Sequence, residues 1–204
     1  MAKKIITSID EMDAALRKIL GAQRYRHSQG VRYTAAALAM AHGADPAKAE
    51  TAGILHDCAK YMSDENMLKT AKKLKLEITE TESKNPSLLH AKVGACFAQR
   101  KYGITDPDIL SSIRYHTTGK GGMNLLEKII FIADYIEPGR FKADHLPEIR
   151  RMAFKDLDEC IFMILHDTLE YLETSPKDID KTTAEAYNFY KELHESNHSM
   201  EVNV

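Results

Sequence analysis

The stretch Ala52-Gly53-Ile54-Leu55-His56-Asp57-Cys58-Ala59-Lys60 places a histidine and an aspartate inside an otherwise apolar run with helical spacing. An unpaired ionised carboxylate in a protein core costs a large free energy. A divalent metal would compensate His56 and Asp57 together. The alternative is a helix end that turns both side chains to water, and the dipeptide alone favours this second interpretation. The choice between them depends on the rest of the chain.

Helical patterns extend on both sides of this stretch. The pairs Asp45-Pro46, Asn85-Pro86 and Asp106-Pro107 each combine a helix N-cap with a proline at the first helical position. No run alternates apolar and polar residues for long enough to predict a strand. The sequence predicts helices over about 8–20, 25–42, 46–60, 63–74, 86–101, 107–115, 125–136, 149–173 and 181–196, a loop over 139–147 and a frayed tail over 196–204. We therefore expect one all-α domain over residues 1–204, a bundle of about eight or nine helices.

Composition excludes several classes of protein. The 204 residues carry 30 acidic and 28 basic side chains, for a net charge of -2, and 44% of them are hydrophobic. These values are typical of a globular protein, and they argue against a broad basic face that binds extended nucleic acid. No apolar run approaches the roughly 20 residues of a membrane helix, and the N-terminus does not resemble a secretory signal.

The three cysteines are far apart and include no CxxC pair. This spacing argues against a zinc site built from thiolates and against a disulfide framework. We expect Cys58, Cys96 and Cys160 to be buried thiols, and the protein to be cytoplasmic.

Further metal-capable side chains lie on other predicted helices. His27 precedes the His56-Asp57 pair, and Asp134 is a lone acid in the apolar run over 125–136. A mixed imidazole and carboxylate shell suits iron, manganese or zinc better than calcium or magnesium. His90 is as compatible with a core histidine as with a ligand, whereas His116 lies at a helix end before a Thr-Thr-Gly turn and is typical of a site residue. The other histidines lack such neighbours and are not expected to be ligands: His42, His145, His166, His194 and His198.

Three cationic side chains lie close in sequence to these candidates. Lys60 follows His56 by four residues, so on a continuous helix it shares the face of the pair. A lysine beside a metal is repelled unless an anion lies between them, and a phosphate could be that anion. The alternative is a solvated lysine at a helix end. Arg24 lies one turn before His27, and Arg140 follows the predicted helix that carries Asp134.

The order His27, His56-Asp57, His90, His116, Asp134 resembles the HD-domain metal-dependent phosphohydrolases. The wider sequence resembles their YqeK-like branch, the bacterial symmetrical diadenosine tetraphosphate hydrolases, over about residues 20–195. The matching stretches are Arg24-Tyr25-Arg26-His27-Ser28-x-Gly30-Val31, Ala49-Glu50-x-Ala52-Gly53-Ile54-Leu55-His56-Asp57-x-Ala59-Lys60, Tyr115-His116-Thr117-Thr118-Gly119 and Ile132-Ala133-Asp134-Tyr135-Ile136-Glu137-Pro138-Gly139-Arg140. The resemblance implies a helical fold, iron at the His/Asp site and hydrolysis of the dinucleotide to two molecules of ADP.

The expected reaction is attack of a metal-activated water on a phosphorus of the polyphosphate bridge. The expected ligands of one or two ions of iron, manganese or another divalent transition metal are His27, His56, Asp57, Asp134, His90 and His116. Asp57 and Lys60 are the expected catalytic residues. The expected phosphate or nucleotide contacts are Arg24, Lys60, His90, His116, Thr117 and Arg140.

Three alternatives stay open at this point. The chain could hydrolyse another nucleotide, such as a nucleoside monophosphate, guanosine tetraphosphate or a cyclic dinucleotide. It could be a regulatory module that binds nucleotides without turnover, or a helical scaffold with incidental histidines. The sequence also leaves open a homodimer through the apolar face of 149–173, and a role for Thr182–Asn188 in covering the base.

Overall fold

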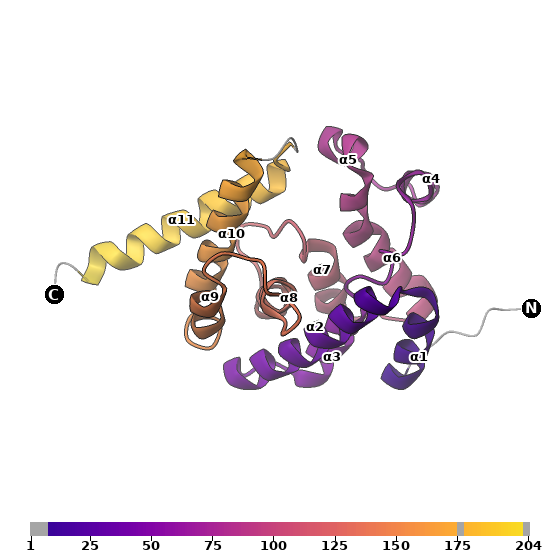
Figure 1. The fold of residues 1–204 in the computed structure, drawn as a ribbon, viewed down its shortest axis with the longest axis horizontal. Helices are drawn as coiled ribbons and strands as arrows, with labels where there is room; N and C mark the ends of the chain where they lie inside the picture. Colours follow the sequence, from indigo (N-terminus) through magenta and orange to yellow (C-terminus); the bar gives the residue numbers. More distant parts are fainter. Residues whose placement is uncertain (1–7, 175–177, 202–204) are drawn as a thin grey trace, which may run out of the picture.

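Helix α8 (Leu125–Ile136) lies at the centre of the fold (Figure 1). The computed structural model describes residues 8–174 and 178–201, and every regular element within these two ranges is a helix. Helices α2 (Ala22–His42), α3 (Pro46–Leu55) and α7 (Pro107–Tyr115) pack against α8, as does α10 (Leu157–Glu173). The predicted all-α class is confirmed, while the expectation of a single domain over 1–204 stays a prediction.

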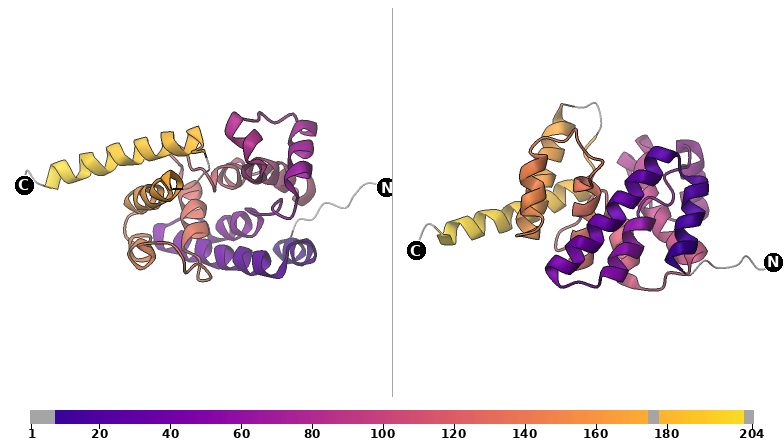
Figure 2. Two further views of the ribbon diagram at one scale, coloured as in Figure 1. Left: turned by 45° about the horizontal axis from the view of Figure 1, so that its top comes forward. Right: turned by 60° about the horizontal axis from the view of Figure 1, so that its bottom comes forward.

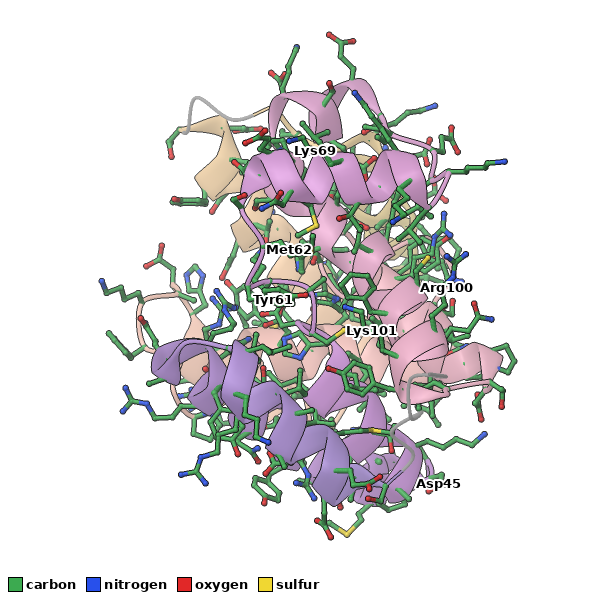
Figure 3. The ribbon with its side chains drawn as sticks, turned by 90° about the vertical axis from the view of Figure 1, so that its right-hand side faces the viewer. Asp45, Tyr61, Met62, Lys69, Arg100 and Lys101 are labelled. Carbon is green, nitrogen blue, oxygen red and sulfur yellow. The ribbon has the colours of Figure 1, made fainter. Side chains whose placement is uncertain are left out.

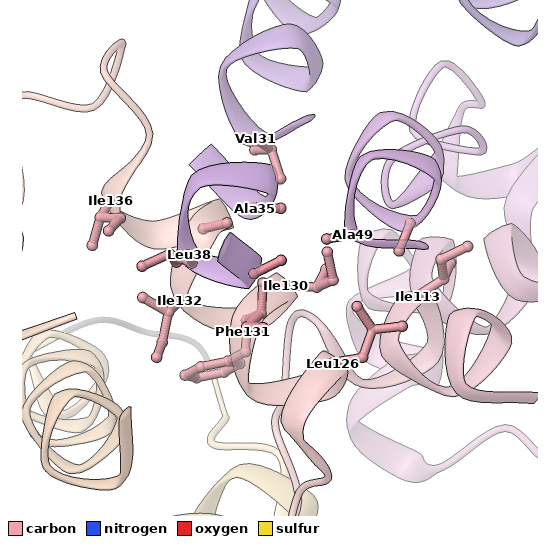
Figure 4. Close-up of a cluster of buried hydrophobic side chains, with 14 of the residues drawn as sticks. Val31, Ala35, Leu38, Ala49, Ile113, Leu126, Ile130, Phe131, Ile132 and Ile136 are labelled. Atoms are coloured by element: carbon pink, nitrogen blue, oxygen red, sulfur yellow. The ribbon is translucent and has the colours of Figure 1, made fainter. Parts of the chain in front are cut away.

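The apolar surface of α8 explains its central position. Ile129, Ile130, Ile132 and Ala133 are completely buried, although they project in different directions around the helix. A helix with apolar residues around most of its circumference is stable only when neighbours surround it. Figure 4 shows the core that results, in which side chains of α8 meet those of α2, α3 and α7: Leu126, Ile130, Phe131, Ile132 and Ile136 with Val31, Ala35, Leu38, Ala49 and Ile113.

The remaining elements surround this core. They are α1 (Ile9–Ile19), α4 (Asp64–Lys73), α5 (Glu80–Lys84), the short 3-10 helix Pro86–Leu89, α6 (His90–Tyr102), α9 (Leu146–Met152) and α11 (Lys181–Glu201). A second, smaller apolar cluster lies where α4, the 3-10 helix and α6 meet. Helix α11 packs on α10 and then extends beyond the body of the molecule in all views (Figures 1 and 2). No helix of the described ranges is long and apolar enough to cross a membrane.

Eleven α-helices occur in the described ranges, so the predicted count of eight or nine is wrong. The predicted helix 149–173 is two helices, because the Asp156 carboxylate accepts from the N–H groups of Asp158 and Glu159 and begins α10 anew. Helix α5 was not predicted, although Thr79 and Glu82 form a capping box at its start. The tail does not fray from Ser196, since α11 continues to Glu201; residues 202–204 lie outside the described ranges.

Two predicted boundaries are also wrong near the histidines. Helix α3 ends at Leu55 instead of 60, and α6 begins at His90, after the 3-10 helix that Pro86 starts. Residues 56–62 form turns between α3 and α4, where Figure 3 marks Tyr61 and Met62. Met62 packs against the smaller apolar cluster and so anchors these turns.

The cysteines are free thiols, as expected, but they differ in burial. Cys58 and Cys160 are buried, whereas Cys96 is only partly buried, so the prediction of three buried thiols is wrong for Cys96.

Gly53 allows α3 to approach α2 closely. A Cβ atom at this position would lie 2.9 Å from the Cα atom of Arg32, which is backbone and cannot rotate away. Gly94, also helical and buried, differs, because a Cβ atom there would meet its nearest neighbour, the His56 carbonyl oxygen, at 3.4 Å. The two glycines therefore form a matched pair for testing the crossing of α2 and α3.

We expect Gly53→Ala to lower the free energy of unfolding by about 1 to 3 kcal/mol, because overpacking a tight contact forces the backbone to shift. Gly94→Ala is expected to be neutral or to gain up to about 1 kcal/mol from helix propensity. Urea unfolding of chelator-treated protein, followed by circular dichroism, measures both. Equal losses for the two variants would contradict the proposed close approach at Gly53.

Candidate metal and phosphate site

Four histidines and two aspartates converge on one region between the helices. The Nε2 atom of His27 lies 3.0 Å from Oδ1 of Asp134 and 3.2 Å from Nε2 of His56. The Nε2 atoms of His90 and His116 lie 3.1 Å apart. The six side chains come from α2, the end of α3, the turn after it, the start of α6, the end of α7 and α8: His27, His56, Asp57, His90, His116 and Asp134. The structure thus brings together all six candidates predicted from the sequence.

Asp57 lies between two groups of histidines. Its Oδ2 atom is 3.4 Å from Nε2 of His56 and 3.8 Å from Nε2 of His27. Its Oδ1 atom is 3.2 Å from Nε2 of His90 and 3.7 Å from Nε2 of His116. The carboxylate therefore presents one oxygen to each group, which is the arrangement that a shared ligand of two ions requires.

Three of the histidines are oriented by the helix ends on which they stand. His56 and His116 follow the last residues of α3 and α7, and His90 follows the 3-10 helix. Each Nδ1 donates to the carbonyl three residues earlier: Gly53 at 2.7 Å, Ser87 at 2.5 Å and Ile113 at 2.8 Å. Because a carbonyl only accepts hydrogen bonds, Nδ1 carries the proton and Nε2 turns its lone pair to the cluster.

His27 is oriented by a carboxylate instead. Its Nδ1 atom donates to Oε1 of Glu137 at 3.1 Å. Glu137 is buried and also accepts from the backbone N–H of Gly139 at 2.5 Å. Gly30 makes room for it, because a Cβ atom there would overlap the Glu137 carboxylate. The role of Glu137 was not predicted from the sequence, although the residue is a second acid three positions after Asp134 within one of the matching stretches.

The cluster has the donor atoms that a divalent transition metal needs, and His90 and Asp57 have the required protonation states. Burial lowers the pKa of His90 to about 4, so its imidazole is neutral at physiological pH. Burial opposes ionisation of Asp57, but the surrounding histidines, His56 first, hold the pKa of that carboxyl well below its usual range. Neutral imidazoles and ionised carboxylates are the forms that bind such metals. Lone pairs and negative oxygens that face each other within 4 Å also repel one another unless a cation lies between them.

Cationic side chains surround this cluster. Arg24 Nη1 lies 2.7 Å from Oδ2 of Asp57, and Arg140 Nη2 lies 3.1 Å from Oδ1 of Asp134. Both guanidinium groups are partly exposed, at 40% and 46% of their side-chain surfaces, so an incoming anion can reach them.

Lys60 and Thr117 lie at the His90 and His116 end. Lys60 Nζ is 3.1 Å from Nδ1 of His90, and burial lowers the pKa of this lysine. The expectation that Lys60 shares a helix face with His56 and Asp57 is wrong, because α3 ends at Leu55 and the lysine reaches the site through a turn. The Thr117 hydroxyl lies 3.0 Å from Nε2 of His116 and 3.2 Å from Nε2 of His90.

Other histidines lie away from the cluster. His42 bonds the carbonyl of Ala153, and His145, His166 and His194 each pair with an acidic residue. The side chain of His198 is outside the described part of the chain.

The stretch Thr182–Asn188 lies in α11. This part of α11 contacts the loop that follows Thr117: Ala186, within the stretch, lies beside Gly119, and Phe189, just after it, lies beside Gly121. The role of this stretch in covering the base stays a prediction.

A cleft of about 940 Å³ opens beside His27. It is lined by the first turns of α2 and by the loop after α8, including Arg24, Arg26, Glu137, Arg140 and Phe141. This cleft was not predictable from the sequence, because its two walls are more than 100 positions apart and neither has an unusual composition.

Several known proteins are similar to this chain. The HD domain family model matches residues 24–139. The chain is 40% identical over 180 residues to a Bacillus subtilis protein named bis(5'-nucleosyl)-tetraphosphatase, symmetrical, covering 88% of this chain and 96% of that relative. A Halalkalibacterium halodurans protein of the same name is 42% identical over 165 residues, covering 81% of this chain and 87% of the relative.

The fold also matches a solved structure. A crystal structure from Clostridium acetobutylicum, described as a predicted HD superfamily hydrolase involved in NAD metabolism, superposes with a TM-score of 0.88 at 37% identity. The match covers 92% of this chain and 99% of that one.

We expect Glu137→Ala to weaken metal binding about 10- to 100-fold, the usual cost of removing the partner that orients a metal-ligating histidine. Glu137→Gln should lose less metal affinity than Glu137→Ala, since its amide oxygen still accepts the hydrogen bond from Nδ1 of His27 but carries no charge. Competition with a chromophoric chelator measures the affinity. Glu148→Ala, at a half-exposed carboxylate in α9, is the control and should match the wild type. Unchanged affinity in Glu137→Ala would show that His27 needs no such partner.

Metal affinity should depend on pH through His27. Burial lowers its pKa, but Asp134 and Glu137 outweigh burial and raise it above 6.5. A metal needs the neutral imidazole, so affinity should rise about tenfold per pH unit below the raised pKa and level off above it. His90 and Asp57 titrate at lower pH and should not contribute between pH 6 and 8.5. Titration with Mn²⁺ at several pH values tests this; a constant affinity across that range would contradict it.

Proposed function

Because the chain belongs to the HD-domain family and to that of its symmetrical bis(5'-nucleosyl)-tetraphosphatase relatives, we propose a hydrolytic function. The proposed reaction is hydrolysis of diadenosine tetraphosphate to two molecules of ADP. The observation that carries the proposal is the cluster of four histidines and two aspartates, in which Asp57 faces both histidine groups and cationic side chains lie within reach. Such a site suits a polyanionic substrate that reacts beside metal ions.

We propose that the cluster holds iron, as one or two ions, with manganese or another divalent transition metal as the alternative. His27, His56 and Asp134 would hold one ion, His90 and His116 the other, and Asp57 would contact both. When bound, such ions lower the pKa of water and neutralise phosphate oxygens. Two sets of three side chains each bring their ligand atoms within 4.8 Å of one another: His27, His56 and Asp134, and His56, Asp57 and His116. The first set supports the assignment of the first ion, and the second set supports Asp57 and His116 as ligands of a further ion.

The side chains around the cluster would bind and orient the polyphosphate. Within the described residues, Lys60 has no carboxylate within 4 Å, so its charge is available to a phosphate oxygen. Arg24 and Arg140 can exchange their carboxylate partners for phosphate oxygens, which arginine binds with two parallel hydrogen bonds. Thr117 offers a hydroxyl at the other end of the site. These four groups would stabilise the charge that develops on the phosphates as the bond breaks.

A thiol nucleophile is not part of this proposal. Cys58 follows Asp57 directly, but burial raises the pKa of its thiol to about 12. A cysteine that attacks phosphorus must form a thiolate near neutral pH, and Cys58 does not. Its Sγ instead donates to the carbonyl of Gly94 at 3.5 Å, which is a structural role. Water is therefore the nucleophile that the site supports.

The free thiols support a cytoplasmic location, which we include in the proposal. A homodimer through α10 stays a prediction.

Hydrolysis of another nucleotide is the alternative within the same chemistry, and a binding module without turnover is the alternative outside it. Six buried or partly buried candidate ligands argue against a module that has lost its metals, because a bound ion would offset the cost of burying them.

The test uses purified protein loaded with Fe²⁺ without oxygen, or with Mn²⁺, and incubated with diadenosine tetraphosphate. We expect ADP as the sole nucleotide product, separated by anion-exchange chromatography. His56→Ala and Asp57→Ala should lose both bound metal and turnover, while His166→Ala, at a half-exposed histidine of α10, should keep both. Intact substrate with fully loaded protein, beside an active control enzyme, would overturn the proposal. Cleavage of another nucleotide in a panel would then identify the alternative activity.

A further inference from the structure

Arg150 in α9 binds backbone carbonyls, whereas Arg24 and Arg140 bind carboxylates. Its Nε atom donates to the carbonyl of Ile136 at 3.0 Å, and Nη2 donates to the carbonyls of Glu137 and Arg140, each at 2.9 Å. Within the described residues, no carboxylate oxygen lies within 4 Å of this partly buried side chain. The hydrogen bonds of Arg150 to the described chain therefore all go to the end of α8 and the segment after it.

The three carbonyls belong to the last residue of α8 and to a tight turn. The N–H of Arg140 donates to the carbonyl of Glu137 at 2.9 Å and closes a turn over residues 137–140, which we call the α8 turn. Arg150 reaches the first and the last carbonyl of this turn. The final carbonyls of a helix have no partner within it, and a cation is favoured at that end. Arg150 thus caps α8 and holds the α8 turn with one guanidinium group.

The two end residues of the α8 turn each contact a candidate metal ligand. Glu137 accepts from Nδ1 of His27 at 3.1 Å. Arg140 donates from Nε to the carbonyl of Asp134 at 3.2 Å, and its Nη2 lies 3.1 Å from Oδ1 of the same residue. A displacement of the turn would therefore move the partners of two ligands, and it would release His27 from the only carboxylate bonded to its Nδ1 among the described residues.

Helix α9 gives Arg150 a fixed position. Leu146 and Ile149 are buried, and α9 packs against both α8 and α10 (Figure 1). His145, which precedes α9, lies 3.1 Å from Asp167 of α10. Residues 138–140 are exposed, so packing against the core contributes little to holding the α8 turn. The hydrogen bonds from Arg150 are therefore the main connection between this turn and the rest of the fold on that side.

We propose that Arg150 is a positioning residue of the metal site, which holds the α8 turn so that Glu137 orients His27. The inference rests on the proposed function and adds to it a residue outside the six candidate ligands. Arg150 does not line the cleft beside His27, so it acts on the site only through the turn that it binds.

The first measurement follows amide hydrogen exchange of the metal-free protein by mass spectrometry. Arg150→Ala should speed exchange in peptides that cover the α8 turn by about tenfold or more, because hydrogen bonds from a charged donor are lost. Arg151→Ala is the matched control, at the next position of the same helix, where the guanidinium pairs with Glu148 on the surface. Its exchange in the same peptides should equal that of the wild type.

The second measurement is Mn²⁺ affinity by competition with a chromophoric chelator. Arg150→Ala should weaken binding about 3- to 10-fold, less than the loss expected for Glu137→Ala, since the carboxylate remains but is less well placed. Arg150→Lys keeps the charge without the planar fork, so it should also weaken binding, and it serves if Arg150→Ala does not fold. Asp156→Ala removes the N-cap of α10 and controls for lost stability alone; it should bind Mn²⁺ as the wild type does.

A double-mutant cycle tests the route from Arg150 to the metal site. In a Glu137→Ala background, Arg150→Ala should cost less Mn²⁺ affinity than it does in the wild type, because the carboxylate through which it acts is absent. The same loss in both backgrounds would overturn the inference, since Arg150 would then act independently of Glu137.

Turnover separates this inference from the proposed function. Wild-type exchange and Mn²⁺ affinity in both Arg150→Ala and Arg150→Lys would overturn the positioning role, even if the wild type cleaves diadenosine tetraphosphate. A loosened α8 turn and weaker Mn²⁺ binding in these variants, together with a loaded wild type that leaves the dinucleotide intact, would support the positioning role and refute the proposed function.

Discussion

The site depends on four imidazoles and two carboxylates that each lie within about 4 Å of at least one other member, where lone pairs and negative oxygens repel each other without a cation. Three of the imidazoles are held by carbonyls of the helices that end beside them, and the fourth by Glu137. The helix ends must therefore be fixed precisely, and the buried α8 fixes those of α3 and α7, which both pack against it.

Much of the fold was predictable because its signals are local. Asp45-Pro46 and Asp106-Pro107 begin α3 and α7 through side-chain caps, as the sequence indicated. The end of α3 was not predictable from periodicity, because apolar residues continue past Leu55. The turn that follows is accompanied by the hydrogen bond from Nδ1 of His56 to the carbonyl of Gly53. The split between α9 and α10 was missed for a similar reason, since the Asp156 cap lies inside an amphipathic pattern.

The ligand candidates of the site were predictable from the sequence, whereas the residues around them were less so. His56, Asp57 and Asp134 stand out because charged or titratable side chains in apolar helices need a partner, whereas the full set of six followed from the family resemblance. Glu137 lies in the same motif, but its role depends on a contact with His27, 110 positions earlier in the chain. Phe141 and Arg26 carry no signal in the sequence, because an exposed phenylalanine and an exposed arginine are common, and only the meeting of two distant walls makes them a cleft.

The helix ends at His56 and His116 have an electrostatic consequence as well as a geometric one. Peptide dipoles align along a helix, so its carboxyl end carries roughly half of a negative elementary charge. Helices α3 and α7 both end at the cluster, and their dipoles point their negative ends at any cation bound there. The backbone itself thus supplies part of the counter-charge for the metals. Two aspartates can then suffice where a site on loops would need more, which leaves room in the coordination shell for neutral histidines and an anionic substrate.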